Sequence, residues 1–176
     1  MNLEGVLTTP YSELMIRLLV SDDESIIQEL CERCSDFFML IEGRLPEKNA
    51  GHDILFDLPP NKELFDKFVY GVFNKNNVLL AVIDIVRNYK CVGEWVLGLL
   101  LIDPNERGKG LGQNIHDYVK NLVRENNGNK LRIGVVEENK IALRFWKGIG
   151  YSEVDRVMAT YGNKEHNVII MNLPLS

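Results

Sequence analysis

Residues 107–112 combine glycine and basic side chains directly after an apolar run, a pattern that favours an anion-binding turn. The run at residues 96–102 is typical of a buried strand, and Asp103-Pro104 ends it. A helix that starts out of the turn leaves its first amides without internal partners, and its dipole favours negative charge there. Gly108, Gly110 and Gly112 carry no side chains, so a phosphate can approach the backbone. The segment therefore predicts the binding of a pyrophosphate-bearing cofactor.

Two common phosphate motifs do not match this turn. The nucleotide P-loop requires serine or threonine after Gly-Lys to hold magnesium, whereas Gly110 follows Gly108-Lys109 here. The dinucleotide fingerprint requires a third glycine where this chain has Gln113, and it normally lies on the first strand of a domain.

Two segments, in order, resemble signatures of the GNAT superfamily of acyl-CoA-dependent N-acyltransferases. Arg107-x-x-Gly110-x-Gly112 is similar to the family's pyrophosphate-binding signature. Residues 139–151 are similar to its Asn-x-x-Ala-x-x-Phe-Tyr-x-x-x-Gly-Phe segment. The resemblance is specific over residues 94–151 and is topological elsewhere.

The resemblance implies acetyl-CoA as cosubstrate and no metal. It also implies that the strand before the signature and the strand after Lys130 splay apart, with the pantetheine arm in the gap. The residues that it assigns to the cofactor are Leu100, Leu101, Ile102, Arg107, Gly108, Lys109, Gly110, Leu111, Gly112, Asn139, Phe145 and Trp146. Ordinary structural roles are the alternatives for some of these: a surface lysine for Lys109, a helix N-cap for Asn139, and core packing, which the pattern favours, for Phe145 and Trp146.

Acyl transfer to an amine requires the amine to lose a proton, and two acids are candidates for the base. A lysine-like amine has a reference pKa of about 10.4, so deprotonation at neutral pH costs about 4–5 kcal/mol. A carboxylate can lower that cost. Glu94 lies two residues before Val96, the position of a glutamate base in one branch of the family, and so on the same strand face. Asp84 lies within an apolar strand, where an acid needs a partner or an unusual pKa. The alternatives are that Asp84 pairs with Arg87 or a backbone donor, and that Glu94 is a solvated strand end.

The proton donor departs from the family pattern. Many members have a tyrosine directly after the phenylalanine of the second segment, and this chain has Trp146. An indole donates a hydrogen bond but is not an acid near neutral pH. Either another group serves, or the thiolate leaves unassisted, or the protein does not catalyse, and we assign no acid.

Cys31 and Cys34 form a CxxC, which is typical of a redox pair or half a zinc site. A zinc site needs a second ligand pair, and the sequence has none of suitable spacing. The motif lies within a helical apolar pattern, so we predict that both cysteines are core residues. His116 is predicted on the exposed side of its helix, with no metal role.

The elements that position these residues alternate between strand and helix patterns. Residues 21–24 predict a capping box in which Ser21 and Glu24 open the first helix. Residues 43–60 are expected to form an irregular loop, with a short helix after Pro60. Helices are predicted at about 24–38, 111–127 and 139–149, and strands at 14–20, 68–73, 78–86, 96–102, 131–135, 151–159 and 167–172. We predict one α/β domain over residues 1–176, with a central mixed, mostly antiparallel twisted sheet of about seven strands flanked by helices.

The chain of 176 residues has an ordinary globular composition and a formal net charge of −5. This charge argues against nucleic-acid binding and is compatible with a cationic acceptor. The apolar runs are too short to span a bilayer and residues 1–10 lack a secretion signal, so we expect a cytoplasmic protein without a membrane partner.

We therefore predict an N-acetyltransferase that acts on a small primary amine by direct attack in a ternary complex, as a monomer or homodimer. The acids Asp53, Asp57, Asp84 and Glu94 favour an acceptor such as a polyamine, amino acid or aminoglycoside-like compound. The alternatives are acetylation of a protein lysine or N-terminus, and a non-catalytic acyl-CoA sensor, which Trp146 would explain.

Overall fold

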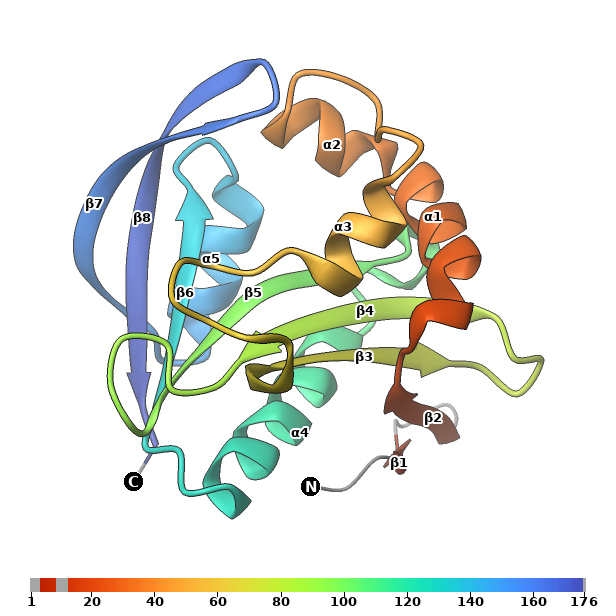
Figure 1. Ribbon diagram of the computed structural model, residues 1–176, viewed down its shortest axis with the longest axis horizontal. Helices are drawn as coiled ribbons and strands as arrows, with labels where there is room; N and C mark the ends of the chain where they lie inside the picture. The colour runs from red at the N-terminus through yellow and green to blue at the C-terminus, as the bar shows by residue number, and fades with distance from the viewer. Residues whose placement is uncertain (1–3, 9–12, 176) are drawn as a thin grey trace.

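A computed structural model describes residues 4–8 and 13–175 of the chain (Figure 1). One sheet of eight strands runs through it in the order β1-β2-β3-β4-β5-β6-β8-β7. The strands are β1 (Glu4–Thr8), β2 (Glu13–Leu18), β3 (Lys67–Phe73), β4 (Leu79–Val86), β5 (Glu94–Ile102), β6 (Lys130–Val136), β7 (Ser152–Tyr161) and β8 (Lys164–Pro174). The helices are α1 (Glu24–Arg33), α2 (Ser35–Ile41), α3 (Ala50–Phe56), α4 (Leu111–Glu125) and α5 (Lys140–Gly148), with short 3-10 turns η1 (Ser21–Asp23), η2 (Leu64–Asp66) and η3 (Pro104–Glu106).

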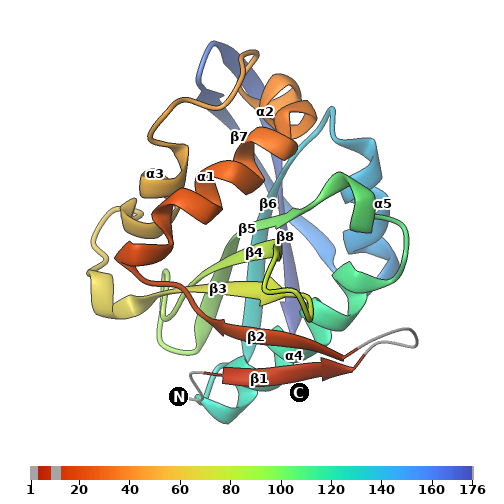
Figure 2. The ribbon, with the colours of Figure 1, turned by 90° about the vertical axis from the view of Figure 1, so that its right-hand side faces the viewer.

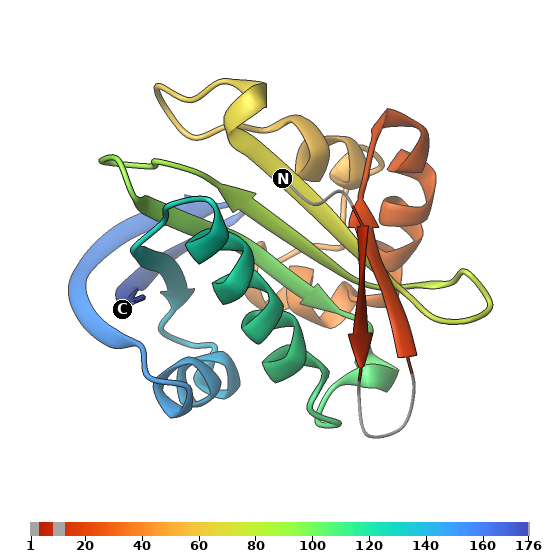
Figure 3. The same cartoon turned by 90° about the horizontal axis from the view of Figure 1, so that it is seen from below.

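The helices cover both faces of the sheet. In Figure 2, α1, α2 and α3 lie on one side and α4 and α5 on the other. Figure 3 views the second face, along which α4 runs beneath the central strands. Each face has its own apolar core, built around Ile27 and Leu30 of α1 on one side and around Ile115 and Val119 of α4 on the other. The predicted fold class is confirmed.

The sheet has eight strands and not about seven. The additional strand is β1, which pairs antiparallel with β2. Leu7 is the buried residue among Glu4 to Leu7, so the segment carries too little apolar alternation to be distinguished from a loop in the sequence.

The gap expected beside the central strand is present. All strand pairs are antiparallel except β5 and β6, which are parallel. The register of this pair joins Glu94 with Lys130, Trp95 with Leu131 and Val96 with Arg132. Beyond Val96 the described pairing ends, so the two strands separate toward their C-terminal ends, where α4 and α5 begin.

A bulge in β5 lies opposite Asp84. Ile85 pairs with Leu97 and Asp84 pairs with Leu99, which leaves Gly98 as the additional residue between them. Leu97 packs in the core beneath α4, whereas Leu99 packs against the core beneath α1. In a regular strand Leu97 and Leu99 would share one face, and the bulge places them on opposite faces of the sheet.

The first helical segment differs from its prediction in two respects. The predicted capping box is wrong, because the carboxylate of Asp23, and not the side chains of Ser21 and Glu24, accepts a hydrogen bond from Val20 N at 2.9 Å. The helix is also interrupted at Cys34, which separates α1 from α2.

The segment expected to be an irregular loop contains the helix α3. A Cβ at Gly51 would lie 2.5 Å from the carbonyl oxygen of Glu24, so glycine allows α3 to approach the backbone of α1. The contact joins residues 27 positions apart, and local sequence patterns do not report it.

The core prediction for Cys31 and Cys34 is confirmed, since both are fully buried. Burial raises the pKa of the Cys31 thiol to about 12, which keeps it protonated and unreactive. The prediction for His116 is wrong, because this residue is fully buried between α4 and α5. None of the helices in the described part of the chain combines the length and the apolar composition that crossing a membrane requires.

Candidate active site

The glycine turn before α4 leaves its backbone open on one side. Gly108 has φ +74° and Gly110, the N-cap of α4, has φ +85°, conformations that favour glycine. A Cβ at either position would meet no atom of the described residues within 4 Å. A Cβ at Gly112 would lie 3.3 Å from Cζ of Phe145, so this third glycine serves helix packing. An open backbone at a helix N-terminus suits a phosphate group, and the residues present fit a pyrophosphate-bearing cosubstrate.

Arg107 joins this turn to α2. Its Nε donates to the carbonyl oxygen of Ile102 at 2.9 Å, and its Nη1 and Nη2 donate to the carboxylate of Asp36 at 2.5 and 3.1 Å. Hydrogen bonding to Arg107 lowers the pKa of the Asp36 carboxyl. The guanidinium thus holds the turn in place. Lys109 is exposed, and its Nζ lies 3.6 Å from Oε2 of Glu106.

The backbone of β5 offers alternate groups to the gap. Asp103 N donates to Leu80 O on the β4 side, and Ile102 O accepts from Arg107 on the other side. By the alternation of an antiparallel ladder, the backbone groups of Leu100 and Ile102 point toward the gap and those of Leu101 pair with β4. The structure therefore favours Leu100 over Leu101 as a backbone partner of a ligand in the gap.

The second segment forms the start of α5. Asn139 Oδ1 accepts from Ala142 N at 3.1 Å, which makes Asn139 the expected N-cap. Phe145 is half-buried beside Gly112, at the edge of the glycine turn. Trp146 is buried, with its ring 5.8 Å from that of His116 and 5.3 Å from that of Tyr151. Trp146 is therefore a core residue between α4 and α5.

His116 and Tyr151 form a polar pair within this core. Nε2 of His116 lies 3.2 Å from the hydroxyl of Tyr151. Burial lowers the pKa of His116 to about 4 and raises the pKa of Tyr151 above its ordinary value. At neutral pH the imidazole is uncharged and the phenol is protonated, so the pair is a packing feature with internal hydrogen bonding.

Asp84 faces the bulge and is held by Lys67. Lys67 Nζ donates to Asp84 Oδ2 at 2.7 Å and to the carbonyl oxygen of Asp57 at 2.8 Å. The side chain of Lys67 is 3% exposed and that of Asp84 is 17% exposed, so the ion pair is mostly shielded from water. A Cβ at Gly98 would lie 3.4 Å from Asp84 Oδ2, which places the carboxylate directly beside the bulge. We name Lys67, Asp84 and Gly98 the bulge cluster.

One oxygen of the Asp84 carboxylate has no hydrogen-bond partner among the described residues. This oxygen is Oδ1, and it is buried. Burial raises the pKa of Asp84, while the charge of Lys67 opposes this shift. The predicted alternative of an Asp84–Arg87 pair is wrong, because Arg87 pairs with Asp66 at 3.1 Å.

Glu94 lies apart from the bulge cluster. The residue is 3% exposed and its carboxylate pairs with Lys130 Nζ at 2.5 Å, so the alternative of a solvated strand end is wrong. Glu94 precedes Gly98 by four residues, which corresponds to about 13 Å along a strand. The structure does not bring the two candidate bases together.

Sequence reasoning missed Lys67 and the bulge. A glycine inside a strand pattern often marks a bulge, so Gly98 within residues 94–102 carried a usable signal. Lys67 carried none, because its role depends on the pairing of β3 with β4.

Comparisons with known proteins agree with this geometry. Residues 29–151 match the model of the Acetyltransferase (GNAT) family. The chain is 32% identical over 80 residues to the N-terminal acetyltransferase B complex catalytic subunit naa20 of Schizosaccharomyces pombe, a match that covers 44% of each protein. It is 23% identical over 121 residues to the uncharacterized N-acetyltransferase YobR of Bacillus subtilis, covering 68% of this chain and 45% of that protein. The matched segments thus span less than half of these curated relatives.

Solved structures share the fold at low identity. An acetyltransferase from Thermus thermophilus superposes with a TM-score of 0.75 at 18% identity, over 97% of this chain and 100% of that one. The ribosomal-protein-S18-alanine N-acetyltransferase of Escherichia coli gives a TM-score of 0.68 at 16% identity, over 93% of this chain and 94% of that one.

Proposed function

Because the chain belongs to the GNAT family of acetyltransferases, we propose that it transfers the acetyl group of acetyl-CoA to a primary amine of a small molecule, by direct attack in a ternary complex. The observation that carries this proposal is the open glycine turn at the N-terminus of α4, beside the gap between β5 and β6. The amides of Leu111 and Gly112 would bind the pyrophosphate, and the backbone of Leu100 and Ile102 would bind the pantetheine arm. Gly98 precedes the strand end by four residues, about 13 Å, a distance that an extended arm can span.

In this proposal the bulge cluster would supply the groups that the transfer requires. A bulge leaves a backbone amide without a partner in the ladder, and such an amide near Gly98 would donate to the oxyanion of the tetrahedral intermediate. Oδ1 of Asp84 would accept the proton of the attacking amine as the carbon–nitrogen bond forms. The carbon–sulfur bond then breaks and the electron pair leaves with the thiolate. Since a thiol has a reference pKa of about 8.5, this leaving group needs no strong acid, which accommodates Trp146.

Asp84 is favoured over Glu94 as the base. The carboxylate of Asp84 lies beside Gly98, whereas Glu94 lies at the paired start of β5, about 13 Å away along the strand. The raised pKa of Asp84 brings its basicity closer to that of the amine.

A protein N-terminus is a second candidate acceptor. The names of the relatives naa20 and the ribosomal-protein-S18-alanine N-acetyltransferase describe acetylation of that kind. Three of the acids that favoured a polycationic small molecule have partners within the fold, since Asp53 contacts Asn49, Asp84 contacts Lys67 and Glu94 contacts Lys130. A panel of small amines and short peptides, assayed with acetyl-CoA, distinguishes the two acceptors.

Calorimetric titration with acetyl-CoA tests the cosubstrate, with ATP and NAD as controls. We expect saturable one-to-one binding of acetyl-CoA alone. Gly110→Ala places a methyl group in the space proposed for the phosphate and should weaken binding at least tenfold. Gly150→Ala is the matched control, because Gly150 also has a positive φ, +104°, but lies at the far end of α5. Equal affinity of both variants would refute the site, and binding without turnover of any amine would favour a sensor.

A further inference from the structure

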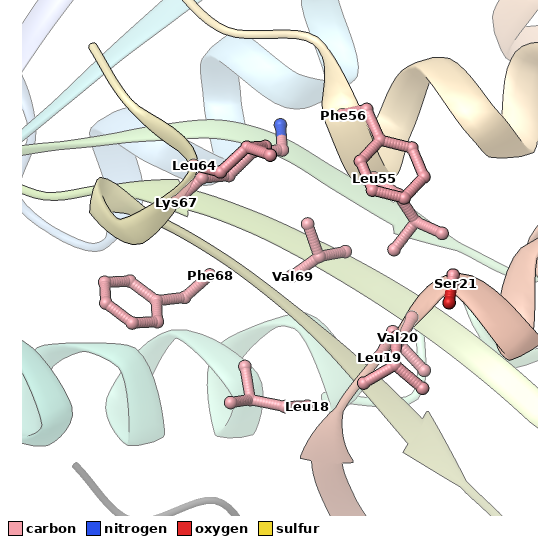
Figure 4. A pocket seen from close by; sticks show the side chains of 10 residues that line it. All are labelled: Leu18, Leu19, Val20, Ser21, Leu55, Phe56, Leu64, Lys67, Phe68 and Val69. Atoms are coloured by element: carbon pink, nitrogen blue, oxygen red, sulfur yellow. The ribbon is translucent and has the colours of Figure 1, made fainter.

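A cavity of about 240 Å³ lies on the α1–α3 face of the sheet (Figure 4). It is open to solvent on one side and is lined by residues of the end of β2, the turn that follows β2, α3, η2 and the start of β3. Eight of its ten lining residues are apolar: Leu19, Val20, Leu55, Phe56, Leu64 and Val69, together with Leu18 and Phe68, whose side chains pack against the core beneath α4. The other two are Ser21, which is exposed, and Lys67.

The cavity borders the bulge cluster. Val69 pairs with Asp84 across β3 and β4, so their side chains share a face with Cβ atoms about 4.5–5.5 Å apart. Lys67 directs its Nζ to Asp84 and Asp57, which leaves its alkyl chain as part of the cavity wall. Gly98 lies two strands from β3, or about 10 Å at the usual strand spacing.

The acceptor has to approach from this face. The glycine turn starts α4, and α4 and α5 cover the opposite face (Figure 2). Asp84 lies on the α1–α3 face with Val69. An amine positioned between Asp84 and Gly98 therefore has the remainder of its molecule over β4 and β3, within reach of the cavity.

We infer that the acceptor is a primary amine carrying an apolar chain or ring, and that this group fills the cavity while the amine meets Asp84. This inference rests on the proposed function and specifies its substrate class. The charges agree with it, because Lys67 already neutralises Asp84 and is the one charged residue of the lining. A second ammonium group on the acceptor would enter an apolar cavity beside a lysine, at a desolvation cost that no carboxylate of the lining offsets.

The test compares kcat/KM along the series from ethylamine to hexylamine, with 1,6-diaminohexane as the cationic counterpart. Burial of each methylene group should raise kcat/KM about threefold to fourfold until the cavity is filled. Hexylamine should exceed 1,6-diaminohexane at least tenfold. Two tetrapeptide amides, one beginning with Met and one with Gln, test whether a peptide supplies the apolar group. Their first side chains have similar length, so a higher kcat/KM for the Met peptide than for the Gln peptide and hexylamine would identify a peptide as the source.

Filling the cavity from its rim provides the matched variants. Ser21→Phe places a ring at an exposed lining position and should lower kcat/KM for hexylamine at least tenfold while sparing ethylamine. Ser25→Phe makes the same change at an exposed position of α1 outside the lining and should leave both values unchanged. As a control for folding, both variants should bind acetyl-CoA with the affinity of the wild type.

Rates that are flat along the series, or higher for the diamine, would overturn the inference and leave acetyl transfer standing. If none of the amines is acetylated, calorimetry measures the binding of hexylamine and 1,6-diaminohexane to the CoA-saturated protein. Tighter binding of hexylamine, lost in Ser21→Phe, would support the inference. Equal binding of the two amines, or no binding, would overturn it. Failure to bind acetyl-CoA would instead overturn the proposed function, and the inference with it.

Discussion

Replacing Lys67 by methionine should destabilise the folded protein in a pH-dependent manner. The variant keeps most of the apolar volume of the side chain but removes the charge that pairs with Asp84 at 2.7 Å. It also removes the donor to the carbonyl oxygen of Asp57. The carboxylate of Asp84 then remains within the sheet without a compensating charge.

The expected cost follows from burial. Because Lys67 is 3% exposed and Asp84 17% exposed, the pair is close to the buried limit, where removal of one partner costs about 3–5 kcal/mol. Without Lys67, the folded-state pKa of Asp84, already raised by burial, rises further above the unfolded value of about 3.9. Between these two values the folded state binds more protons than the unfolded state, so stability falls as pH rises. Relative to the wild type, the loss should shrink by about 1.4 kcal/mol per pH unit as the pH falls from the folded-state pKa of Asp84 in the variant to that in the wild type.

Urea unfolding at pH 7 and pH 5 measures the effect. Lys120→Met is the matched control, since Lys120 pairs with Asp117 at 2.7 Å but the two side chains are 26% and 49% exposed, and its cost should stay below about 1 kcal/mol. The double variant Lys67→Met/Asp84→Asn should recover part of the loss, because no buried charge is left unpaired. A loss below about 1 kcal/mol at pH 7, or additive single effects, would refute the buried pair.

Further variants test catalysis and the core. Asp84→Asn should lower kcat about 10²–10⁴-fold with the Kd of acetyl-CoA unchanged, whereas Glu94→Gln should lower it less than tenfold; the reverse order would assign the base to Glu94. Trp146→Tyr should not raise kcat, and should lower Tm in a thermal melt, because position 146 is in the core; a faster enzyme would contradict that placement. Wild-type stability should fall on acidification from about pH 6.5 toward 4, because the unfolded imidazole of His116 takes up a proton that the folded one, with a pKa of about 4, does not. Urea unfolding of His116→Phe should lose this part of the pH dependence, and a variant with the wild-type slope would contradict it.

Local sequence patterns were sufficient to predict the glycine turn before α4 and the N-cap of α5. Gly108 and Gly110 require positive φ, and Asn139 caps α5 through a bond to a residue three positions away. Such features depend on a few adjacent residues, so their types and spacing record them directly.

Contacts between distant segments explain the failed predictions. His116 is predicted on an exposed helix face, but α5 covers this part of α4 with Trp146. Proximity in the sequence offers Arg87 as one alternative partner of Asp84, whereas the sheet register brings Lys67 to it across 17 positions. In both cases the tertiary arrangement, and not the local pattern, selects the partner.

The same arrangement changes which acceptors the site favours. The sequence suggested that acidic side chains would attract a polycation, yet Asp84 and Glu94 are each neutralised by a lysine in the folded protein. The remaining net charge of −5 is distributed over a surface where a Debye length of about 8 Å screens it at physiological ionic strength. Charge alone therefore gives a diamine little advantage over a monoamine near Gly98. Under the proposal made above, discrimination would then depend on the apolar surface that the acceptor buries in the cavity beside Val69.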